Sequence, residues 1–383
     1  MAEWKETAIL EIIDIIGGGT PKTSIADYWN GEIPWLSVKD FNNDNRYVYD
    51  TEKHISDLGL NNSSTKLLQR DDIIISARGT VGEIAMIPYP MAFNQSCYGI
   101  RAKAGTDKAF LYYLLKYKIA DLKRMTHGSV FDTITRDTFA NLIVSLPPYE
   151  IQRRIASVLM LIDDKIECNS RINDNLAELL QTVYQERFGD VSAATEQGML
   201  SDICSYSRDR VAVSELNAST YFSTENMLPG KAGATEAASL PTIPQTTACH
   251  KGDTLISNIR PYFKKIVYCE DRCGCSTDVL CFTPVQPKYA AYLFSTLYAD
   301  KFFAFMVAGS KGTKMPRGDK QQIMAYPVAL PSDEELDEFN KLALPILAQL
   351  HSNKAENKRL SATRDALLPK LMSGEIDVSA IQL

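Results

Sequence analysis

Side chains able to contact nucleic acid stand in short glycine-rich or small-residue segments of this 383-residue chain. An arginine that follows an apolar run can hold guanine through two hydrogen bonds or bind a phosphate, and amide side chains match the edge of adenine. The candidates in the first half of the chain are Thr20, Lys22, Lys39, Arg78, Thr80, Asn94, Gln95, His127 and Ser129. We predict that they bind DNA. Two structural alternatives stay open, because Arg78 can pair with a nearby acid and Asn94 can cap a turn.

The second half carries a comparable set, in which basic residues accompany amide, hydroxyl and aromatic ones. Its members are Arg208, Arg210, Asn258, Arg260, Tyr262, Lys264, Ser310, Lys311, Thr313, Lys314 and Arg317. The net charge of −6 argues against a uniformly basic protein but allows a local basic surface. A lone surface lysine is often merely solvated, and that alternative stays open for each of them.

Segment 17–22 (GGGTPK) is similar to a phosphate-binding loop, but its proline argues against nucleotide binding. Pro21 removes a backbone donor where such a loop has glycine before the lysine. The segment can instead bring Thr20 and Lys22 to a DNA phosphate, with the glycines allowing close approach, or it is a plain glycine turn.

The sequence lacks the other patterns expected of a DNA-modifying enzyme. At 146–149 (LPPY) a leucine stands where adenine methyltransferases carry Asp or Asn, and no helicase phosphate-binding loop or convincing catalytic constellation follows. We predict a non-catalytic DNA-binding protein. The enzymatic alternative is a magnesium-dependent nuclease that uses Asp71, Asp72 and Glu83.

Four of the eight cysteines cluster at 269–281 in a C-x3-C-x-C-x5-C spacing. This spacing differs from the paired C-x2-C segments of structural zinc sites. The alternation of Val279, Cys281 and Thr283 indicates a strand in which cysteine is a small buried apolar residue. No metal is therefore predicted in this chain.

The elements that must position these residues occur twice. Segment 146–188 and segment 330–372 each begin with Leu-Pro and continue as a long charged helix, and a shift of about 184 positions superimposes them. The globular parts also match, since 70–78 (RDDIIISAR) resembles 251–260 (KGDTLISNIR). A rigid frame with divergent loops suits a protein that reads two different ligands.

Both helices have a seven-residue apolar repeat, which predicts that each packs along another helix. If the copies are related by a pseudo-twofold axis, they run antiparallel, and Asn169 then faces Asn357 while Asn173 faces Asn353. The same register pairs Ile155 with Leu371, Leu159 with Leu367, Ile166 with Leu360, Leu176 with Leu350, Leu180 with Ile346 and Val183 with Ala343. Ile162 facing Arg364 is the one poorly matched layer, and Pro345 is expected to kink the second helix.

The predicted fold is α+β, with two duplicated α/β domains joined by two long helices that form an antiparallel coiled coil. The expected boundaries are domains at 1–148 and 199–331, helices at 149–188 and 332–372, a linker at 189–198 and a tail at 373–383. No apolar run approaches the roughly 18 residues of a membrane span. Together with the absence of a signal peptide, this predicts a cytoplasmic protein.

The chain resembles the specificity subunits of type I restriction-modification systems. The resemblance rests on GGGTPK at 17–22, YWNGEIPWLSVKDF at 28–41, SARGTVG at 76–82, NQSCYGI at 94–100, LPPYEIQRRIA at 146–156 and ATRDALLPKLMSGEIDV at 362–378. Members of this family have two target-recognition domains separated by two helical spacers. The start of the second domain departs from the pattern, because it has no GGTP element.

The resemblance implies a non-catalytic subunit that reads a bipartite, interrupted and asymmetric DNA site. It also implies two methyltransferase subunits that use S-adenosylmethionine, and motor-endonuclease subunits that use ATP and magnesium, with no cofactor in this chain. The alternative is a DNA-binding regulator or scaffold of the same duplicated architecture, which would show no methyltransferase partner on purification.

Overall fold

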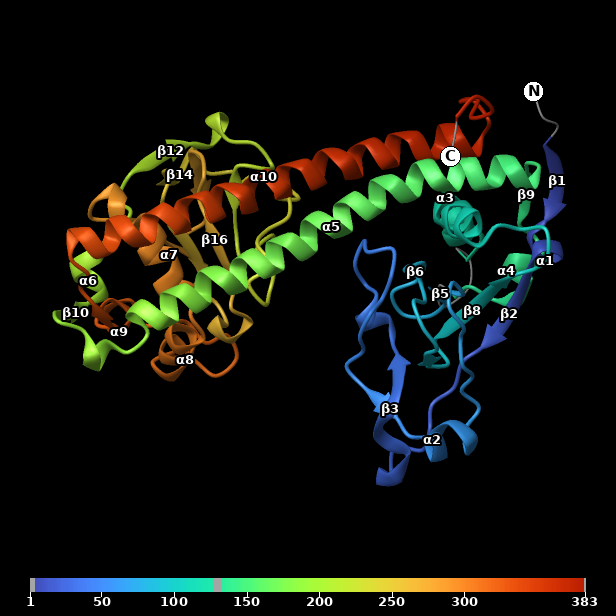
Figure 1. The fold of residues 1–383 in the computed structure, drawn as a ribbon, viewed down its shortest axis with the longest axis horizontal. Helices are drawn as coiled ribbons and strands as arrows, with labels where there is room; N and C mark the ends of the chain where they lie inside the picture. The colour runs from blue at the N-terminus through green and yellow to red at the C-terminus, as the bar shows by residue number, and fades with distance from the viewer. Residues whose placement is uncertain (1–3, 127–132, 382–383) are drawn as a thin grey trace. The chain divides into compact units, whose positions relative to one another are not determined.

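The computed structural model describes residues 4–126 and 133–381 and divides the chain into two compact units (Figure 1). The first unit contains Met1–Asn169 and Glu356–Leu383, and the second contains Ser170–Ala355. Helices α5 (Tyr149–Phe188) and α10 (Asp333–Met372) are each 40 residues long, and each contributes to both units. A division at the helix boundaries, as the sequence predicted, therefore does not coincide with the compact units.

In the first unit, the beginning of α5 and the end of α10 run antiparallel. Asp163 bonds Arg364 and Asn169 bonds Asn357, so the residue numbers run in opposite directions along the contact. The Asn169 amide donates to the Asn357 side-chain oxygen at 2.9 Å. In the second unit, the Asn353 amide donates to the Asn173 side-chain oxygen, also at 2.9 Å. Both predicted asparagine pairs are confirmed.

The predicted mismatch at Arg364 was wrong. Its side chain is only 3% exposed, yet its guanidinium bonds the Asp163 carboxylate at 2.9 Å and also pairs with Asp44. Heptad spacing describes only the helical layer, whereas Asp44 lies far away in the sequence. Helix α10 also continues without interruption through Pro345.

The first unit is built on an antiparallel sheet in the order β2-β8-β5-β6. Ile73 and Ile75 face a core that includes α3, α5 and α10, whereas Ile74 belongs to a separate core on the opposite face. Both faces of β5 are therefore buried, which explains its uninterrupted apolar run.

Two smaller sheets complete the strands of this unit, β1-β9 and β4-β3-β7. The strand bounds are β1 (Lys5–Ala8), β2 (Ile13–Gly17), β3 (Trp29–Leu36), β4 (His54–Ile55), β5 (Ile73–Ser76), β6 (Ile84–Met86), β7 (Ala92–Phe93), β8 (Cys97–Ala102) and β9 (Ile143–Leu146). The helices besides α5 are α1 (Ile9–Ile12), α2 (Asp57–Asn61), α3 (Lys108–Thr126), α4 (Arg136–Ala140), η1 (Ala26–Tyr28) and η2 (Val38–Asp40).

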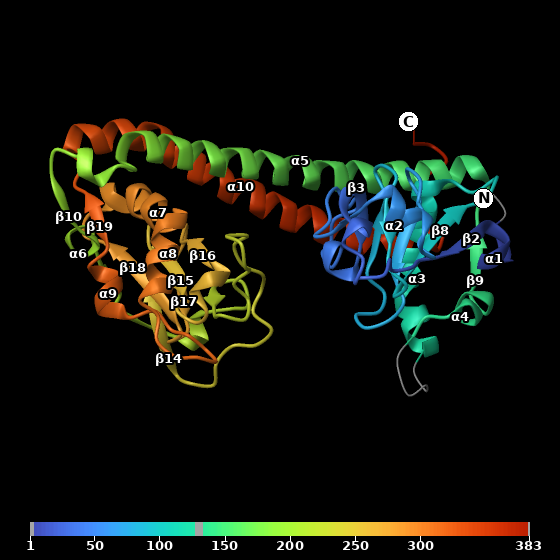
Figure 2. The ribbon, with the colours of Figure 1, turned by 90° about the horizontal axis from the view of Figure 1, so that it is seen from below.

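The second unit repeats the principal sheet, in the order β11-β18-β15-β16 and again antiparallel throughout. Helix α7 packs on β15 and β18 (Figure 2). The β10-β19 pair repeats β1-β9, and a further sheet has the order β12-β14-β17-β13. Both the duplication and the α+β fold class are thus confirmed.

The strands of the second unit are β10 (Gln197–Met199), β11 (Cys204–Tyr206), β12 (Arg210–Ala212), β13 (Tyr221–Phe222), β14 (Gln245–Cys249), β15 (Thr254–Ser257), β16 (Ile266–Tyr268), β17 (Cys273–Cys275), β18 (Val279–Pro284) and β19 (Pro327–Ala329). Its further helices are α6 (Leu200–Ile203), α7 (Ala290–Tyr298), α8 (Asp300–Ala308), α9 (Lys320–Met324), η3 (Val191–Ala193), η4 (Val213–Glu215), η5 (Pro261–Phe263) and η6 (Pro287–Tyr289). The expected linker at 189–198 thus contains η3 and the first two residues of β10. Throughout the described part of the chain, no helix combines the length and apolarity that crossing a membrane requires.

Candidate nucleic-acid interface

One end of the principal sheet collects most of the candidate segments of the first unit. The last residue of β2, Gly17, lies opposite Tyr98 near the start of β8, and the last residue of β5, Ser76, lies opposite Cys97. The segments after β2, before β8 and after β5 therefore leave the sheet at the same end. These segments contain Thr20, Lys22, Arg78, Thr80, Asn94 and Gln95.

Backbone hydrogen bonds hold these three segments together. The amide of Gly19 donates to the carbonyl of Phe93 at 2.9 Å, and the amide of Ala77 donates to the carbonyl of Ser96 at 2.8 Å. The Thr20 hydroxyl also donates to the side-chain oxygen of Gln95. The sequence candidates thus form one surface on a fixed frame.

The glycines of segment 17–22 serve packing. A Cβ on Gly18 would lie 2.1 Å from the carbonyl oxygen of Asn94, and one on Gly19 would lie 2.3 Å from the amide nitrogen of Thr65. Neither position tolerates a side chain. Pro21 is buried, whereas Lys22 is exposed beside this packed turn. Of the two interpretations left open, the packed glycine turn accounts for Gly18 and Gly19, while Lys22 keeps access to a phosphate.

The remaining candidates of the first unit differ in whether their polar groups already bond to other groups of the protein. Arg78 is exposed and has no ion-pair partner among residues 4–126 and 133–381. The Asn94 side-chain oxygen accepts from the amide of Ser96 at 3.0 Å, so the turn-capping alternative applies to it. Lys39 lies 3.7 Å from the Glu52 carboxylate. His127 and Ser129 lie outside the described residues, although Ile134, just after them in the chain, donates to the carbonyl of Ala77 at 3.0 Å.

The second unit forms the equivalent surface at the same end of its own sheet. The amide of Asn258 donates to the carbonyl of Asp278 at 2.8 Å, as Ala77 does to Ser96 in the first unit. The amide of Ser257 donates to the carbonyl of Lys265, as the amide of Ser76 does to the carbonyl of Glu83. Segment 258–264, which contains Arg260, is therefore the structural counterpart of segment 77–82, which contains Arg78.

A second candidate segment, 310–317, joins this surface. The amide of Arg260 donates to the carbonyl of Pro316 at 2.8 Å, and Ile259 forms a β-bridge with Arg317. Lys311 forms a further bridge with Arg317. The structure thus brings together the residues predicted in these two segments, which are Asn258, Arg260, Tyr262, Lys264, Ser310, Lys311, Thr313, Lys314 and Arg317.

Several of these cations have carboxylate partners. Arg317 lies 3.0 Å from Asp278, Lys264 lies 2.9 Å from Asp300, and Lys311 pairs with Asp319. Hydrogen bonds from Lys231 and Lys264 lower the pKa of Asp300. Such exposed pairs are weak, because solvent screens them, and a phosphate can compete for the cation.

Arg260 and Lys314 have no carboxylate partner within the described part of the chain. Arg260 is half-buried, and its buried Nε atom likewise has no hydrogen-bond partner there. Its backbone lies in the left-handed region, with φ of 50°. This conformation is uncommon for a residue with a side chain and often marks a functional position. Arg260 is therefore the strongest candidate of the second surface.

Three further candidates of the second unit are described by their local contacts: Arg208, Arg210 and Ser310. Arg208 is exposed and follows Ser207, whose amide donates to the carbonyl of Cys281 in β18 at 2.9 Å. Arg210 donates to the carbonyl of Gln245 at 3.0 Å, and the Ser310 hydroxyl donates to the carbonyl of Val307 at 2.7 Å. Arg210 and Ser310 thus have local structural roles.

Residues 276–278 (STD) were missed by the sequence reasoning. They precede β18 as 94–96 (NQS) precede β8, and Asp278 receives the backbone bond from Asn258. Thr277 is exposed at this edge. Extending the internal alignment from the matched strands to the next pair would have identified this segment.

The residues of the nuclease alternative do not form a site. The Asp72 carboxylate is buried and bonds the Arg101 guanidinium at 2.6 Å, while Asp71 accepts from the Tyr47 hydroxyl at 3.1 Å. Asp72 precedes β5, whereas Glu83 bonds Ser76 at the opposite end of that strand. Over residues 4–126 and 133–381, no group of three or more His, Cys, Asp or Glu side chains is arranged to hold a metal ion.

The cysteines at 269–281 are buried instead. Cys269, Cys273, Cys275 and Cys281 belong to one apolar core, with Cys249 and Met227. All four are free thiols. Cys273, Cys275 and Cys281 lie in β17 and β18, as small apolar side chains of strands, and Cys269 follows the end of β16.

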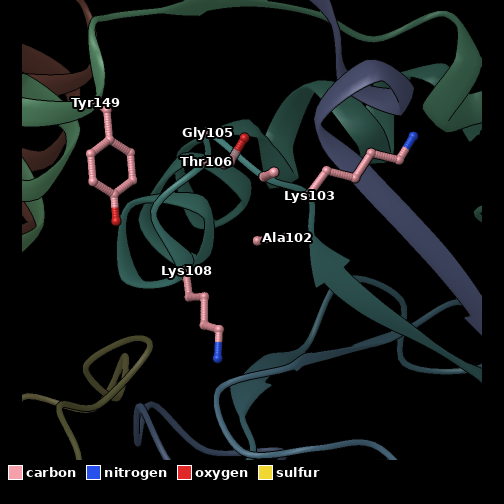
Figure 3. A pocket seen from close by; sticks show the side chains of 7 residues that line it. Ala102, Lys103, Gly105, Thr106, Lys108 and Tyr149 are labelled. Carbon is pink, nitrogen blue, oxygen red and sulfur yellow. The ribbon is translucent and has the colours of Figure 1, made fainter.

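The first unit has a shallow pocket of about 430 Å³ (Figure 3). It is lined by Ala102, Lys103, Ala104, Gly105, Thr106, Lys108 and Tyr149. Ala102 is the last residue of β8, whereas the candidate segments meet its first residue. Lys103 and Lys108 each lie 3.7 Å from a carboxylate, those of Asp14 and Asp71.

Comparisons with known proteins show what this chain is similar to. The family described as type I restriction modification DNA specificity domain matches residues 1–178. The MjaIX specificity subunit of Methanocaldococcus jannaschii, a type I restriction enzyme subunit, is 25% identical over 99% of this chain and 95% of its own length. The EcoR124I/EcoR124II specificity subunit of Escherichia coli is 29% identical over 42% of this chain and 41% of its own.

A solved structure shares the fold. The type I restriction-modification S subunit from M. genitalium superimposes with a TM-score of 0.59 at 17% identity, and the match covers 97% of this chain and 96% of that one. Two sequence comparisons give the same family, since one relative matches 99% of the chain and the family model matches residues 1–178. The duplicated sheets and long helices agree with the fold of the solved structure. The chain is similar to the specificity subunits of type I restriction-modification systems.

Proposed function

We propose that the chain is the sequence-specific DNA-binding subunit of a type I restriction-modification complex. The observation that carries this proposal is that each unit gathers an arginine, Arg78 or Arg260, with further polar side chains at the same end of an equivalent sheet, and neither arginine has a carboxylate partner among the residues that the structure describes. Two equivalent frames with different side chains suit two different DNA half-sites, because loops on a rigid frame determine specificity.

The two surfaces differ in the side chains that they offer. The first presents Arg78 with the hydroxyl and amide groups of segments 20–22 and 94–96, whereas the second adds lysines and an aromatic pair. An asymmetric bipartite site follows from this difference. Arginine and amide groups contact base edges, and lysines such as Lys22 and Lys314 bind phosphates.

The chain supplies recognition, and its partners supply the chemistry. Its relatives carry the name of type I restriction enzyme specificity subunits, and no constellation of the described residues matches a nuclease or a metal centre. By this proposal, two methyltransferase subunits bring S-adenosylmethionine, and motor-endonuclease subunits bring ATP and magnesium. The long helices separate the half-sites and bind the methyltransferase subunits.

Purification of the tagged full chain from its host tests the assembly. A methyltransferase subunit that copurifies, together with sequence-specific adenine methylation by the purified complex, is the expected result. A chain that binds operator-like DNA without such a partner would support the regulator alternative. Cleavage of DNA by the chain alone with magnesium would contradict a non-catalytic role.

A further inference from the structure

Two neighbouring aromatic side chains stand exposed at the tip of the second candidate surface. Tyr262 is 50% exposed and Phe263 is 40% exposed, and their ring centroids are 4.8 Å apart at an interplanar angle of 53°. Across residues 4–126 and 133–381, Phe263 is the one phenylalanine that is exposed. Adjacent exposed aromatic rings often mark a binding surface.

The tip is held firmly in a strained conformation. Both flanking residues, Arg260 and Lys264, have positive φ, of 50° and 51°. The carbonyl of Phe263 accepts from the amide of Gly230 at 2.8 Å, and the amide of Arg260 donates to Pro316 at 2.8 Å. Surrounding segments on both sides thus fix the backbone, and strain of this kind is typical of functional sites.

Charge indicates the ligand of these rings. The tip carries Arg260, Lys264 and Lys265, and the Lys265 ammonium lies 5.9 Å from the centre of the Phe263 ring. Lys264 shares the Asp300 carboxylate with Lys231, whereas Arg260 has no carboxylate partner among the described residues, so a ligand that combines negative charge with flat apolar faces fits this tip. DNA does so, because phosphates flank bases that stack on aromatic side chains.

The equivalent segment of the first unit has no such feature. Residues 77–82 read ARGTVG, with positive φ at Gly79 and Gly82, and contain no aromatic side chain. The aromatic tip is thus a departure of segment 258–264 from its counterpart, segment 77–82. A role in reading one half-site explains why segment 258–264 carries these rings and segment 77–82 does not.

We propose that the Tyr262–Phe263 tip inserts at a base-pair step of the half-site bound by the second unit and stacks on an unstacked base. This inference rests on the proposed function. It predicts a local distortion of one half-site, at a step that unstacks readily, such as a pyrimidine–purine step. The first half-site is read without insertion.

The test uses the complex purified through a tag on the full chain and a synthetic duplex that carries the methylated motif of the host. 2-Aminopurine replaces single bases of each half-site, away from the methylated adenine, because its fluorescence rises when it loses stacking. Wild-type complex should raise the fluorescence at one step of the second half-site. The Tyr262→Ala/Phe263→Ala variant should abolish the rise and weaken binding by about tenfold or more.

Two controls separate the possible failures. Tyr149→Ala, which removes an exposed tyrosine of the first unit, should leave the fluorescence rise unchanged. Circular dichroism should show that the double variant remains folded, since both rings are solvent-exposed. Binding without a fluorescence rise in either half-site would overturn insertion and leave the proposed function intact. Failure of the wild-type complex to prefer the motif over unrelated duplex would overturn the proposed function itself.

Discussion

Replacement of Arg364 by methionine should destabilise the first unit severely. The Arg364 side chain is 3% exposed and bonds Asp163 at 2.9 Å, while it also pairs with Asp44 and Asp365. Burial alone would lower the pKa of the Arg364 guanidinium, but its bonds to Asp44 and Asp163 raise it. Arg364 thus stays charged although it is buried, because the neighbouring carboxylates compensate its charge.

The expected loss of unfolding free energy follows from the buried carboxylate that the substitution leaves without its cation. Asp163 is 6% exposed, and without Arg364 its carboxylate would keep the Tyr113 hydroxyl, at 2.6 Å. Removing one partner of a buried ion pair costs about 3–5 kcal/mol, because the remaining charge is no longer compensated. A second substitution, Asp163→Asn, should recover part of this loss, with a coupling free energy of at least about 1 kcal/mol.

Tryptophan fluorescence measures this effect selectively. The chain has three tryptophans, Trp4, Trp29 and Trp35, and all belong to the first unit. Urea titration followed by tryptophan fluorescence therefore reports the unfolding free energy of that unit. Arg359→Met is the matched control, because Arg359 is an exposed arginine of the same helix and its loss should change the unfolding free energy by at most about 0.5 kcal/mol. An equal effect of the two substitutions would refute the argument.

Three further perturbations test other contacts. Asn353→Ala removes the donor to the buried side-chain oxygen of Asn173 and should lower the unfolding free energy of the second unit by about 1–3 kcal/mol, measured by circular dichroism. Leucine at both positions should restore the stability but loosen the register of the two helices. Burial raises the pKa of Asp44, but Lys116 and Arg364 outweigh it and lower the pKa from 3.8. The stabilisation by Asp44 is therefore present above about pH 3.8 and lost as the pH falls through the lower folded pKa, so the difference in unfolding free energy between wild type and Asp44→Asn should vanish on acidification. Deleting one heptad from both long helices should change the number of base pairs between the half-sites, and an unchanged number would argue against the spacer role.

The sequence predicted those features that depend on periodicity or on the internal repeat. The pairing of Asn169 with Asn357 follows from heptad spacing and an antiparallel arrangement, and the bonds between them confirm it. The sequence also identified Arg78 and segments 20–22 and 94–96 as candidates beside strands. It did not predict that they meet at one end of the sheet, because that depends on the strand order β2-β8-β5.

Contacts between distant segments could not be predicted. Asp44 stands 320 positions before Arg364, and no local pattern joins the two. Whether a lysine is engaged depends on such contacts as well, since Asp300 binds both Lys231 and Lys264 from different segments. The packing role of Gly18 likewise depends on the carbonyl of Asn94, which the sheet places beside it.

Adenine methylation in host DNA tests the central claim most directly. A strain that lacks this gene should lose one bipartite motif, and complementation should restore it. Arg78→Ala should change or relax one half of that motif, whereas Arg260→Ala should affect the other half, because each arginine lies on the surface of a different unit. If both substitutions affect the same half, or if methylation is independent of the gene, the account of two DNA-reading surfaces is wrong.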